Sequence, residues 1–98
     1  MAGLPSFHVE FDDAAKRDLK KLQSEIIRTV LQEIQTRLTT EPYREFKTRI
    51  KKLSGFIPPL YRLRTGDYRT YYRIIEKRVV ILAVLHKKDS DRWLRRMA

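Results

Sequence analysis

The feature that most constrains the fold lies between residues 60 and 75, where two stretches of alternating side chains flank the dipeptide Gly66-Asp67. Tyr, Leu, Ile and Thr recur along both stretches, as is typical of β-strands. Glycine supplies the positive φ that a two-residue hairpin turn requires. The sequence therefore predicts an antiparallel hairpin of residues 60–65 and 68–75.

The two-residue turn also predicts which side chains of the hairpin lie opposite each other. Arg64 should face Arg69, and Arg62 should face Tyr71. Because side chains alternate between the faces of a strand, one face of the hairpin should carry Arg62, Arg64, Arg69, Tyr71 and Arg73. The opposite face is apolar and should pack beneath helices.

The residues before the hairpin predict those helices. Residues 7–11 alternate as a half-buried strand, and Asp12 can cap a first helix that ends near residue 22. Ser24 can cap a second helix, which stops before Glu41-Pro42. The second helix carries an apolar stripe, so we expect it to cover the hairpin face that bears Leu63, Tyr72 and Ile74.

The remaining segments complete an α+β fold. Residues 43–53 fit either a short helix or a loop. Residues 79–85 are uninterruptedly apolar, which indicates a central strand covered on both faces. Asp89 or Ser90 can cap a short last helix. We expect an antiparallel sheet packed on a helical hairpin, in the order β-α-α-β-β-β plus a C-terminal helix, as a single domain over residues 1–98.

The charge of the chain is concentrated in its second half. Residues 1–42 hold six Lys/Arg against seven Asp/Glu, whereas residues 43–98 hold sixteen against five, a net charge of +11. A concentrated positive surface attracts polyanions such as nucleic acid. A solvated face that serves only solubility is the alternative.

Several classes of protein are excluded or disfavoured. The chain has no cysteine, so it forms no disulfide and has no thiolate nucleophile. It shows no signal-peptide pattern, and its longest apolar run is too short for a bilayer, so we expect a cytoplasmic protein without a membrane partner. No paired carboxylates, Ser-His-Asp pattern or phosphate loop occurs, so no metal or other cofactor is implied.

The predicted arginine cluster suggests chemistry on RNA. Like charges opposite each other destabilise a sheet, so Arg64 facing Arg69 is unfavourable unless an anion lies between them. RNA cleavage without a metal needs cations for the phosphate and groups that move protons. Arg62, Arg69 and Lys88 can supply charge, and His86 is expected by strand parity on the same face.

The same residues resemble a known family. The run Lys52-Leu53-Ser54-Gly55, the segment 60–69 ending in Gly66-Asp67-Tyr68-Arg69, and His86-Lys87-Lys88 after an apolar strand are similar to the pattern of the RelE/ParE toxin superfamily. The resemblance covers about residues 7–97 and implies the β-α-α-β-β-β fold. Its RelE branch implies a ribosome-dependent endoribonuclease that cuts mRNA by 2′-hydroxyl attack on the neighbouring phosphate.

The resemblance also implies roles for individual residues. By position, Arg69, Arg62 and Lys88 match catalytic residues of the RelE branch, His86 and Lys87 match its basic triplet, and Lys52 belongs to its basic loop. His86 is the candidate for proton transfer and completes the catalytic set. The predicted arginine cluster adds Arg64, Tyr71 and Arg73 as RNA-binding residues, and Tyr71 and Trp93 can stack on bases. The RelE branch has a functional tyrosine where this chain has Leu94, beside Trp93. The identity of the acid and the base is therefore open.

Other functions stay open at this point. The ParE branch shares the fold and inhibits DNA gyrase, and a non-catalytic nucleic-acid-binding module is a third reading. Either toxin branch implies a cognate antitoxin as partner, whose amphipathic segment covers the basic face. The RelE reading adds mRNA and the ribosome as partners.

The charge distribution yields a first testable prediction. If the basic half contacts RNA phosphates, the affinity for RNA or ribosomes should fall steeply with rising salt, because bound counterions are released. The measurement is the dissociation constant across a salt series. An affinity that stays flat up to physiological salt would show that residues 43–98 are not the contact surface.

Overall fold

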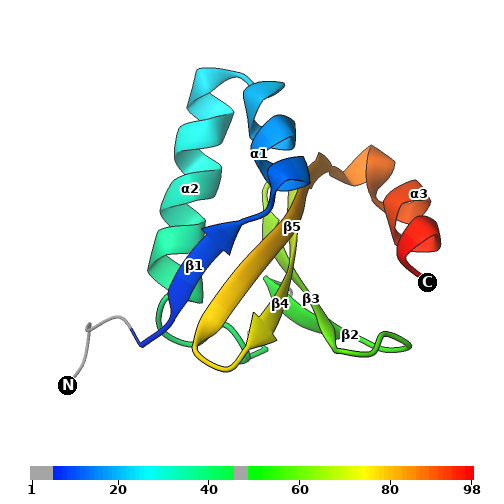
Figure 1. The fold of residues 1–98 in the computed structure, drawn as a ribbon. Helices are drawn as coiled ribbons and strands as arrows, with labels where there is room; N and C mark the ends of the chain where they lie inside the picture. The colour runs from blue at the N-terminus through cyan, green and yellow to red at the C-terminus, as the bar shows by residue number, and fades with distance from the viewer. Residues whose placement is uncertain (1–5, 46–48) are drawn as a thin grey trace.

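A five-stranded sheet with strand order β1-β5-β4-β3-β2 forms the centre of the fold. The computed structural model describes residues 6–45 and 49–98. Along the chain the elements are β1 (His8–Phe11), α1 (Asp13–Lys20), α2 (Ser24–Leu38), β2 (Ile50–Leu53), β3 (Leu60–Thr65), β4 (Tyr68–Ile75), β5 (Arg78–His86) and α3 (Lys87–Met97). Figure 1 shows α1 and α2 side by side and α3 apart from them, near the C-terminus.

The α+β class and the element order predicted from the sequence are confirmed, with two differences in the sheet. Residues 50–53 form the edge strand β2, antiparallel to β3, where a helix or loop was expected. Phe46 and Lys47 of that segment lie outside the described residues. The second difference is that β1 pairs with β5 in parallel, so the sheet is mixed.

The hairpin of β3 and β4 has the predicted register. Arg64 pairs with Arg69 and Arg62 pairs with Tyr71. Gly66 has a φ of 59°, a conformation that glycine adopts without the strain of a Cβ. The turn therefore places the arginines on one face of the sheet and the apolar side chains on the other.

The main core lies between the sheet and the helices α1 and α2. Leu63 and Tyr72 are fully buried in it, and Ile74 packs against it. From α2 come Val30, Ile34 and Leu38, and from β5 come Val79, Ile81 and Val84. The predicted packing of the second helix over this hairpin face is therefore confirmed.

The helix starts differ in how they are capped. The Asp12 carboxylate accepts a hydrogen bond from the Ala15 amide at 2.9 Å, as the sequence predicts for the first helix. The cap position of α2 is Gln23, which makes no side-chain cap hydrogen bond. The prediction that Ser24 caps this helix is wrong, because Ser24 is already its first helical residue.

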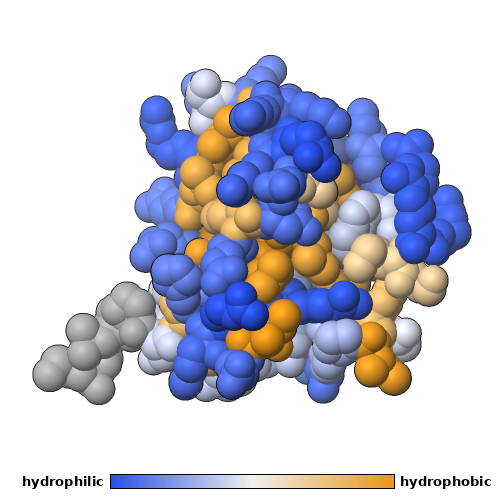
Figure 2. Space-filling model, in the orientation of Figure 1, coloured by the Kyte–Doolittle hydropathy of each residue, from blue (hydrophilic) through white to orange (hydrophobic). Residues whose placement is uncertain are grey.

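A second, smaller core lies on the other face of the sheet. Leu60, Tyr71 and Ala83 are buried there beneath Trp93 and Leu94 of α3. Because α1 and α3 both contact β5, this strand is covered on both faces, as its apolar run predicts. Figure 2 shows hydrophilic residues over the outer surface of α3, at the right of the view. Within the described ranges, no helix combines the length and the apolarity needed to cross a bilayer.

The main core gives a stability prediction at Tyr72. Its hydroxyl donates a 2.6 Å hydrogen bond to the Pro42 carbonyl, and burial raises the pKa of the phenol. Tyr72→Phe should lower the free energy of unfolding by about 1–3 kcal/mol in chemical denaturation, because it leaves a buried carbonyl unpaired. Tyr43→Phe is the matched control, since Tyr43 is 55% exposed. Equal stability of the two variants would contradict the assignment.

Candidate nucleic-acid interface

The four arginines predicted to share a face of the hairpin do share it. We call this surface the arginine face; it consists of Arg62, Arg64, Arg69 and Arg73. Residues paired directly across strands project to the same side, and Arg64 lies opposite Arg69. Arg64 is exposed, whereas the other three are partly buried along their stems. The structure thus confirms the placement of these arginines but does not test their roles.

Arg69 is the best-defined member of the arginine face. Its Nη1 donates to the Gly66 carbonyl at 2.9 Å and to the Tyr68 carbonyl at 3.0 Å, which ties the guanidinium to the hairpin turn. The pKa of Arg69 is lowered by partial burial and by the neighbouring charges of Arg62 and Arg64. These three guanidinium groups therefore lie close enough to repel one another.

The edge strand adds a lysine that sequence reasoning missed. Lys51 pairs with Arg62 and so lies on the arginine face, whereas Lys52 pairs with Tyr61 and lies on the opposite side. Lys52, expected in a basic loop ahead of the strands, therefore lies in β2 and projects away from the arginine face. The reason is that β2 was not predicted, and strand pairing decides which of two consecutive lysines faces which way.

Tyr71 is not open to solvent on this face. It is only 1% exposed, and its ring stacks on that of Trp93 with centroids 4.7 Å apart and an interplanar angle of 23°. The expectation that Tyr71 is free to stack on an RNA base is therefore wrong for this conformation. The physical reason is that α3 folds back over β4 and β5, so that the Trp93 ring covers the Tyr71 ring.

His86 lies on the other face of the sheet from the one that regular alternation of side chains in β5 predicts. It pairs with Tyr68, on the face opposite the arginines, and the two rings meet edge to face at 5.2 Å. Tyr71 pairs with Ala83 but Tyr72 pairs with Ile81, so one extra residue in β5 shifts the register. Such a bulge reverses the alternation of all later side chains in the strand.

The same histidine begins the last helix. Its Nδ1 accepts a 3.1 Å hydrogen bond from the Lys88 amide, so His86 is the N-cap of α3. The prediction that Asp89 or Ser90 is the cap is wrong, because the helix starts directly after β5. In its neutral form the ring then carries its proton on Nε2.

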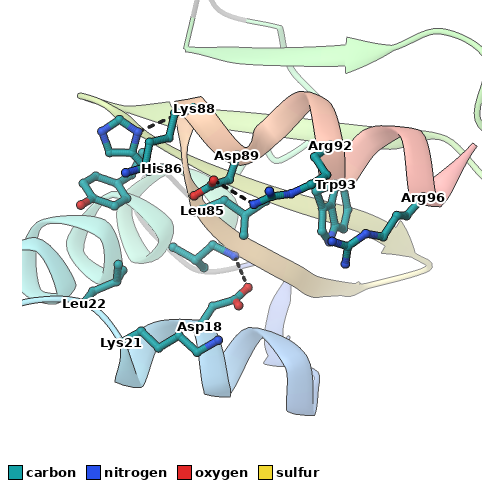
Figure 3. A pocket seen from close by; sticks show the side chains of 12 residues that line it. Asp18, Lys21, Leu22, Leu85, His86, Lys88, Asp89, Arg92, Trp93 and Arg96 are labelled. Atoms are coloured by element: carbon teal, nitrogen blue, oxygen red, sulfur yellow. Dashed lines mark hydrogen bonds and ion pairs between the residues drawn. The ribbon is translucent and has the colours of Figure 1, made fainter.

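Lys88 and Trp93 line a separate cleft together with His86. We call it the α1–α3 cleft; its volume is about 430 Å³. Figure 3 shows Asp18 and Lys21 of the α1 segment facing α3 across it. The Asp18 carboxylate accepts a 3.0 Å hydrogen bond from the Val84 amide, which satisfies the edge of β5 beyond the end of β1.

Lys87 ties the start of α3 to the hairpin turn. Its amide donates to the Asp67 carbonyl at 2.7 Å, and its ammonium lies 3.4 Å from the Asp67 carboxylate. The main acidic neighbour of the arginine face is therefore already paired with a lysine. Arg73 lies farther along β4, opposite Val80, and its buried Nε has no hydrogen-bond partner among residues 6–45 and 49–98.

This arrangement can bind and neutralise an anion more readily than it can move a proton. Four guanidinium groups and Lys51 lie on the arginine face, while His86 lies on the other side of the sheet. In residues 6–45 and 49–98, no three His, Asp or Glu side chains gather as metal ligands. The arginine face can therefore act mainly by stabilising negative charge on a bound group.

Comparisons with known proteins agree with this geometry. The family profile described as the ParE toxin of type II toxin–antitoxin systems matches residues 9–90. Toxin RelG of Mycobacterium tuberculosis is 36% identical over 88 residues, which cover 88% of this chain and 97% of RelG.

Solved structures show the same similarity. A chain of the RelBE2 toxin–antitoxin complex of M. tuberculosis superposes with a TM-score of 0.72 at 35% identity, covering 85% of this chain and 99% of that one. For the archaeal RelE–RelB complex of Pyrococcus horikoshii the TM-score is 0.70 at 28% identity, with 84% and 96% covered. Free E. coli RelE, a mutant form, shares the fold with a TM-score of 0.64 at 18% identity, with 95% and 99% covered.

The repulsion on the arginine face gives a prediction about stability. Arg64→Gln should leave the free energy of unfolding unchanged or raise it by up to roughly 1 kcal/mol, because it removes one of two like charges that face each other. Arg49→Gln is the matched control: Arg49 is also exposed, but it pairs with Glu33 at 3.1 Å, so its loss should not stabilise. Chemical denaturation at low and at high salt measures the free energy of unfolding of both variants. The difference in this free energy between the two variants should shrink at high salt, because salt screens the charges. A larger loss of stability for Arg64→Gln than for Arg49→Gln would show that Arg64 stabilises the sheet.

Proposed function

Because the chain belongs to the RelE/ParE toxin superfamily of type II toxin–antitoxin systems, we propose that it is a toxin that cleaves mRNA on the ribosome. The proposed reaction is attack of a ribose 2′-hydroxyl on the adjacent phosphate, without a metal. Its site is the arginine face, and its consequence is inhibition of translation in the cytoplasm.

One observation carries this proposal: the sheet holds Arg64 directly opposite Arg69, with Arg62 beside them. Among the described residues, the nearby carboxylate of Asp67 is paired with Lys87 rather than with these arginines. Two arginines that face each other lower the stability of the sheet. Such an arrangement is expected at a binding site, where an anionic ligand offsets the repulsion. A phosphodiester has the charge and the acceptor geometry that guanidinium groups bind best.

The proposed roles of the arginines follow from where negative charge accumulates on the phosphate during cleavage. When the 2′-oxygen attacks, charge accumulates on the two non-bridging phosphate oxygens, and the bond to the 5′-oxygen breaks. Arg69, held by its contacts to the turn, is placed to stabilise that charge together with Arg62. The 2′-hydroxyl proton leaves to water, and the departing 5′-oxygen takes a proton in turn.

The residues at the start of α3 have a supporting role in this proposal. His86 lies on the other side of the sheet from the arginines, so in this proposal it acts by capping α3 through Nδ1 and not on the leaving oxygen. Lys88, on the first turn of that helix, adds positive charge. The exposed Lys87 and the partly buried Arg73 would contact neighbouring phosphates of the RNA. Lys52, exposed on the other side of edge strand β2, would contact RNA that passes around that edge.

We also propose a cognate antitoxin as partner. The solved relatives from M. tuberculosis and P. horikoshii were crystallised as toxin–antitoxin complexes. An antitoxin segment that covers Arg62, Arg69 and Lys88 would block access of RNA to the site. A complex in which these three side chains stay open to RNA would contradict this mode of inhibition.

A second function deserves a direct test because the matching family profile is that of ParE toxins. A ParE-like protein would inhibit DNA gyrase and leave mRNA intact. Primer extension on a translated message after brief expression separates the two: discrete cuts within codons support the nuclease, and gyrase-linked DNA damage without such cuts supports the ParE reading.

Arg69→Ala gives the sharpest test of the nuclease proposal. Loss of one preorganised charged donor should reduce mRNA cutting and toxicity about a hundred- to a thousandfold, while the melting temperature stays within a few degrees. Arg28→Ala is the control, because Arg28 is an exposed arginine on α2, outside the arginine face. A variant that unfolds would assign Arg69 a structural role, and undiminished cutting would remove it from the site.

A second variant separates capping from chemistry at His86. His86→Asn should preserve α3, because asparagine is a good N-cap, and should leave cutting nearly unchanged, because the imidazole lies across the sheet from the arginine face. Helix content by circular dichroism and cutting of ribosome-bound message are measured together. A loss of a hundredfold or more, with α3 intact, would show that the imidazole itself transfers the proton.

A further inference from the structure

The α1–α3 cleft carries more positive charge than its carboxylates can neutralise. Four cationic side chains line it, namely Lys21, Lys88, Arg92 and Arg96, against two carboxylates, Asp18 and Asp89. Figure 3 shows Lys21 and Asp18 on the α1 segment and the other four charged side chains spread along α3. The cleft has a volume of about 430 Å³ and opens to solvent beside the end of β5.

Both carboxylates already have partners within the protein. Asp18 accepts the Val84 amide at 3.0 Å, and Asp89 pairs with Arg92 at 3.1 Å. Within the part of the chain that the structure describes, Lys21, Lys88 and Arg96 form no ion pair. These three cations therefore face the same open volume without an internal counterion.

An aromatic wall accompanies these cations. Trp93 lines the cleft and is partly exposed, although one side of its indole stacks on Tyr71. Cations beside a rigid, half-exposed aromatic ring form the combination that binds a nucleotide, whose phosphate and base need one of each.

The cleft also adjoins the arginine face. Leu85, on the floor of the cleft, is the cross-strand partner of Arg69. Trp93 rests on Tyr71, which is the cross-strand partner of Arg62. An RNA strand bound on the arginine face would reach the cleft by passing the first turn of α3.

We propose that the α1–α3 cleft is a second RNA subsite, which holds a nucleotide flanking the bond to be cut. Lys21, Lys88 and Arg96 bind its phosphate, and the exposed part of Trp93 contacts its base. The inference rests on the proposed function, since it names where the substrate continues. It assigns a role to Lys21, which lies outside the segments that carry the basic pattern of the sequence.

RNA fits this cleft better than an acidic protein segment does. Carboxylate side chains would satisfy the three cations but would leave Trp93 without a matching group. A nucleotide supplies a phosphate for the three cations and a base for Trp93. An acidic peptide is therefore the competing occupant that the experiment has to exclude.

The chain contains a single tryptophan, so its fluorescence reports on RNA bound in the cleft or directly beside it, and the Lys21 variant separates the two. We expect a short oligouridylate of about five nucleotides to quench Trp93 in the wild-type protein. Lys21→Gln should raise the dissociation constant roughly two- to fivefold and reduce the slope of its logarithm against log salt by about 0.7, the contribution of one phosphate contact in single-stranded RNA. Lys20→Gln is the matched control, because Lys20 is the exposed neighbour that does not line the cleft.

The outcomes separate this inference from the proposed function. Quenching that weakens in Lys21→Gln but not in Lys20→Gln supports the subsite, even if cutting of ribosome-bound message measured in parallel is absent and the nuclease proposal fails. No quenching by RNA, or equal effects of the two variants, overturns the subsite even where cutting is robust. Stronger quenching by oligoglutamate than by oligouridylate at equal charge overturns it in favour of an acidic protein segment.

Discussion

The two-residue turn at Gly66-Asp67 fixes the register of the β3–β4 hairpin, and the positions of the core and of the basic surface depend on that register. A slip by one residue would exchange the two faces of the strand. Leu63 and Tyr72 would leave the main core, and arginines would replace them beneath α2. Burial of the apolar face therefore holds the arginines on the opposite face, even though Arg64 and Arg69 repel each other.

The face of the sheet that points away from α1 and α2 carries both the smaller hydrophobic core and the arginine face. Over β4 and β5, α3 buries Tyr71 beneath Trp93, while over β3 and the hairpin turn the guanidinium groups stay accessible. The start of α3 is held by two contacts, from His86 to the Lys88 amide and from Lys87 to Asp67. The same helix therefore completes a hydrophobic core and separates the arginine face from the α1–α3 cleft.

The sequence predicts this fold well where the determinants are local. The hairpin, the two N-terminal helices and the buried strand β5 each follow from side-chain periodicity and turn chemistry within a few residues. The two wrong helix caps, Ser24 and Asp89 or Ser90, are local errors, whereas the other errors concern features that arise from contacts between distant segments. The edge strand β2 has only four residues and is stabilised by its pairing with β3. The bulge in β5 depends on the pairing of β5 with β4. The position of α3 over the sheet depends on the stacking of Trp93 on Tyr71.

These differences explain why the candidate site was predicted only in part. Arg62, Arg64 and Arg69 come from one hairpin, so alternation alone brings them together. The faces of Lys51, Lys52 and His86 depend on long-range pairing. Lys51 was missed, Lys52 was expected in a loop, and His86 was expected on the wrong face. Lys21 carries no local signal, because only the approach of α3 to α1 turns its neighbourhood into a cleft.

The central claim is that the arginine face promotes 2′-hydroxyl attack on a phosphodiester of ribosome-bound message. The most direct test is the chemical identity of the ends produced when the purified protein is added to a translating system. The account predicts upstream fragments that end in a 2′,3′-cyclic phosphate and downstream fragments that begin with a 5′-hydroxyl. Fragments with 3′-hydroxyl and 5′-phosphate ends would show a different reaction and contradict it, as would an intact message.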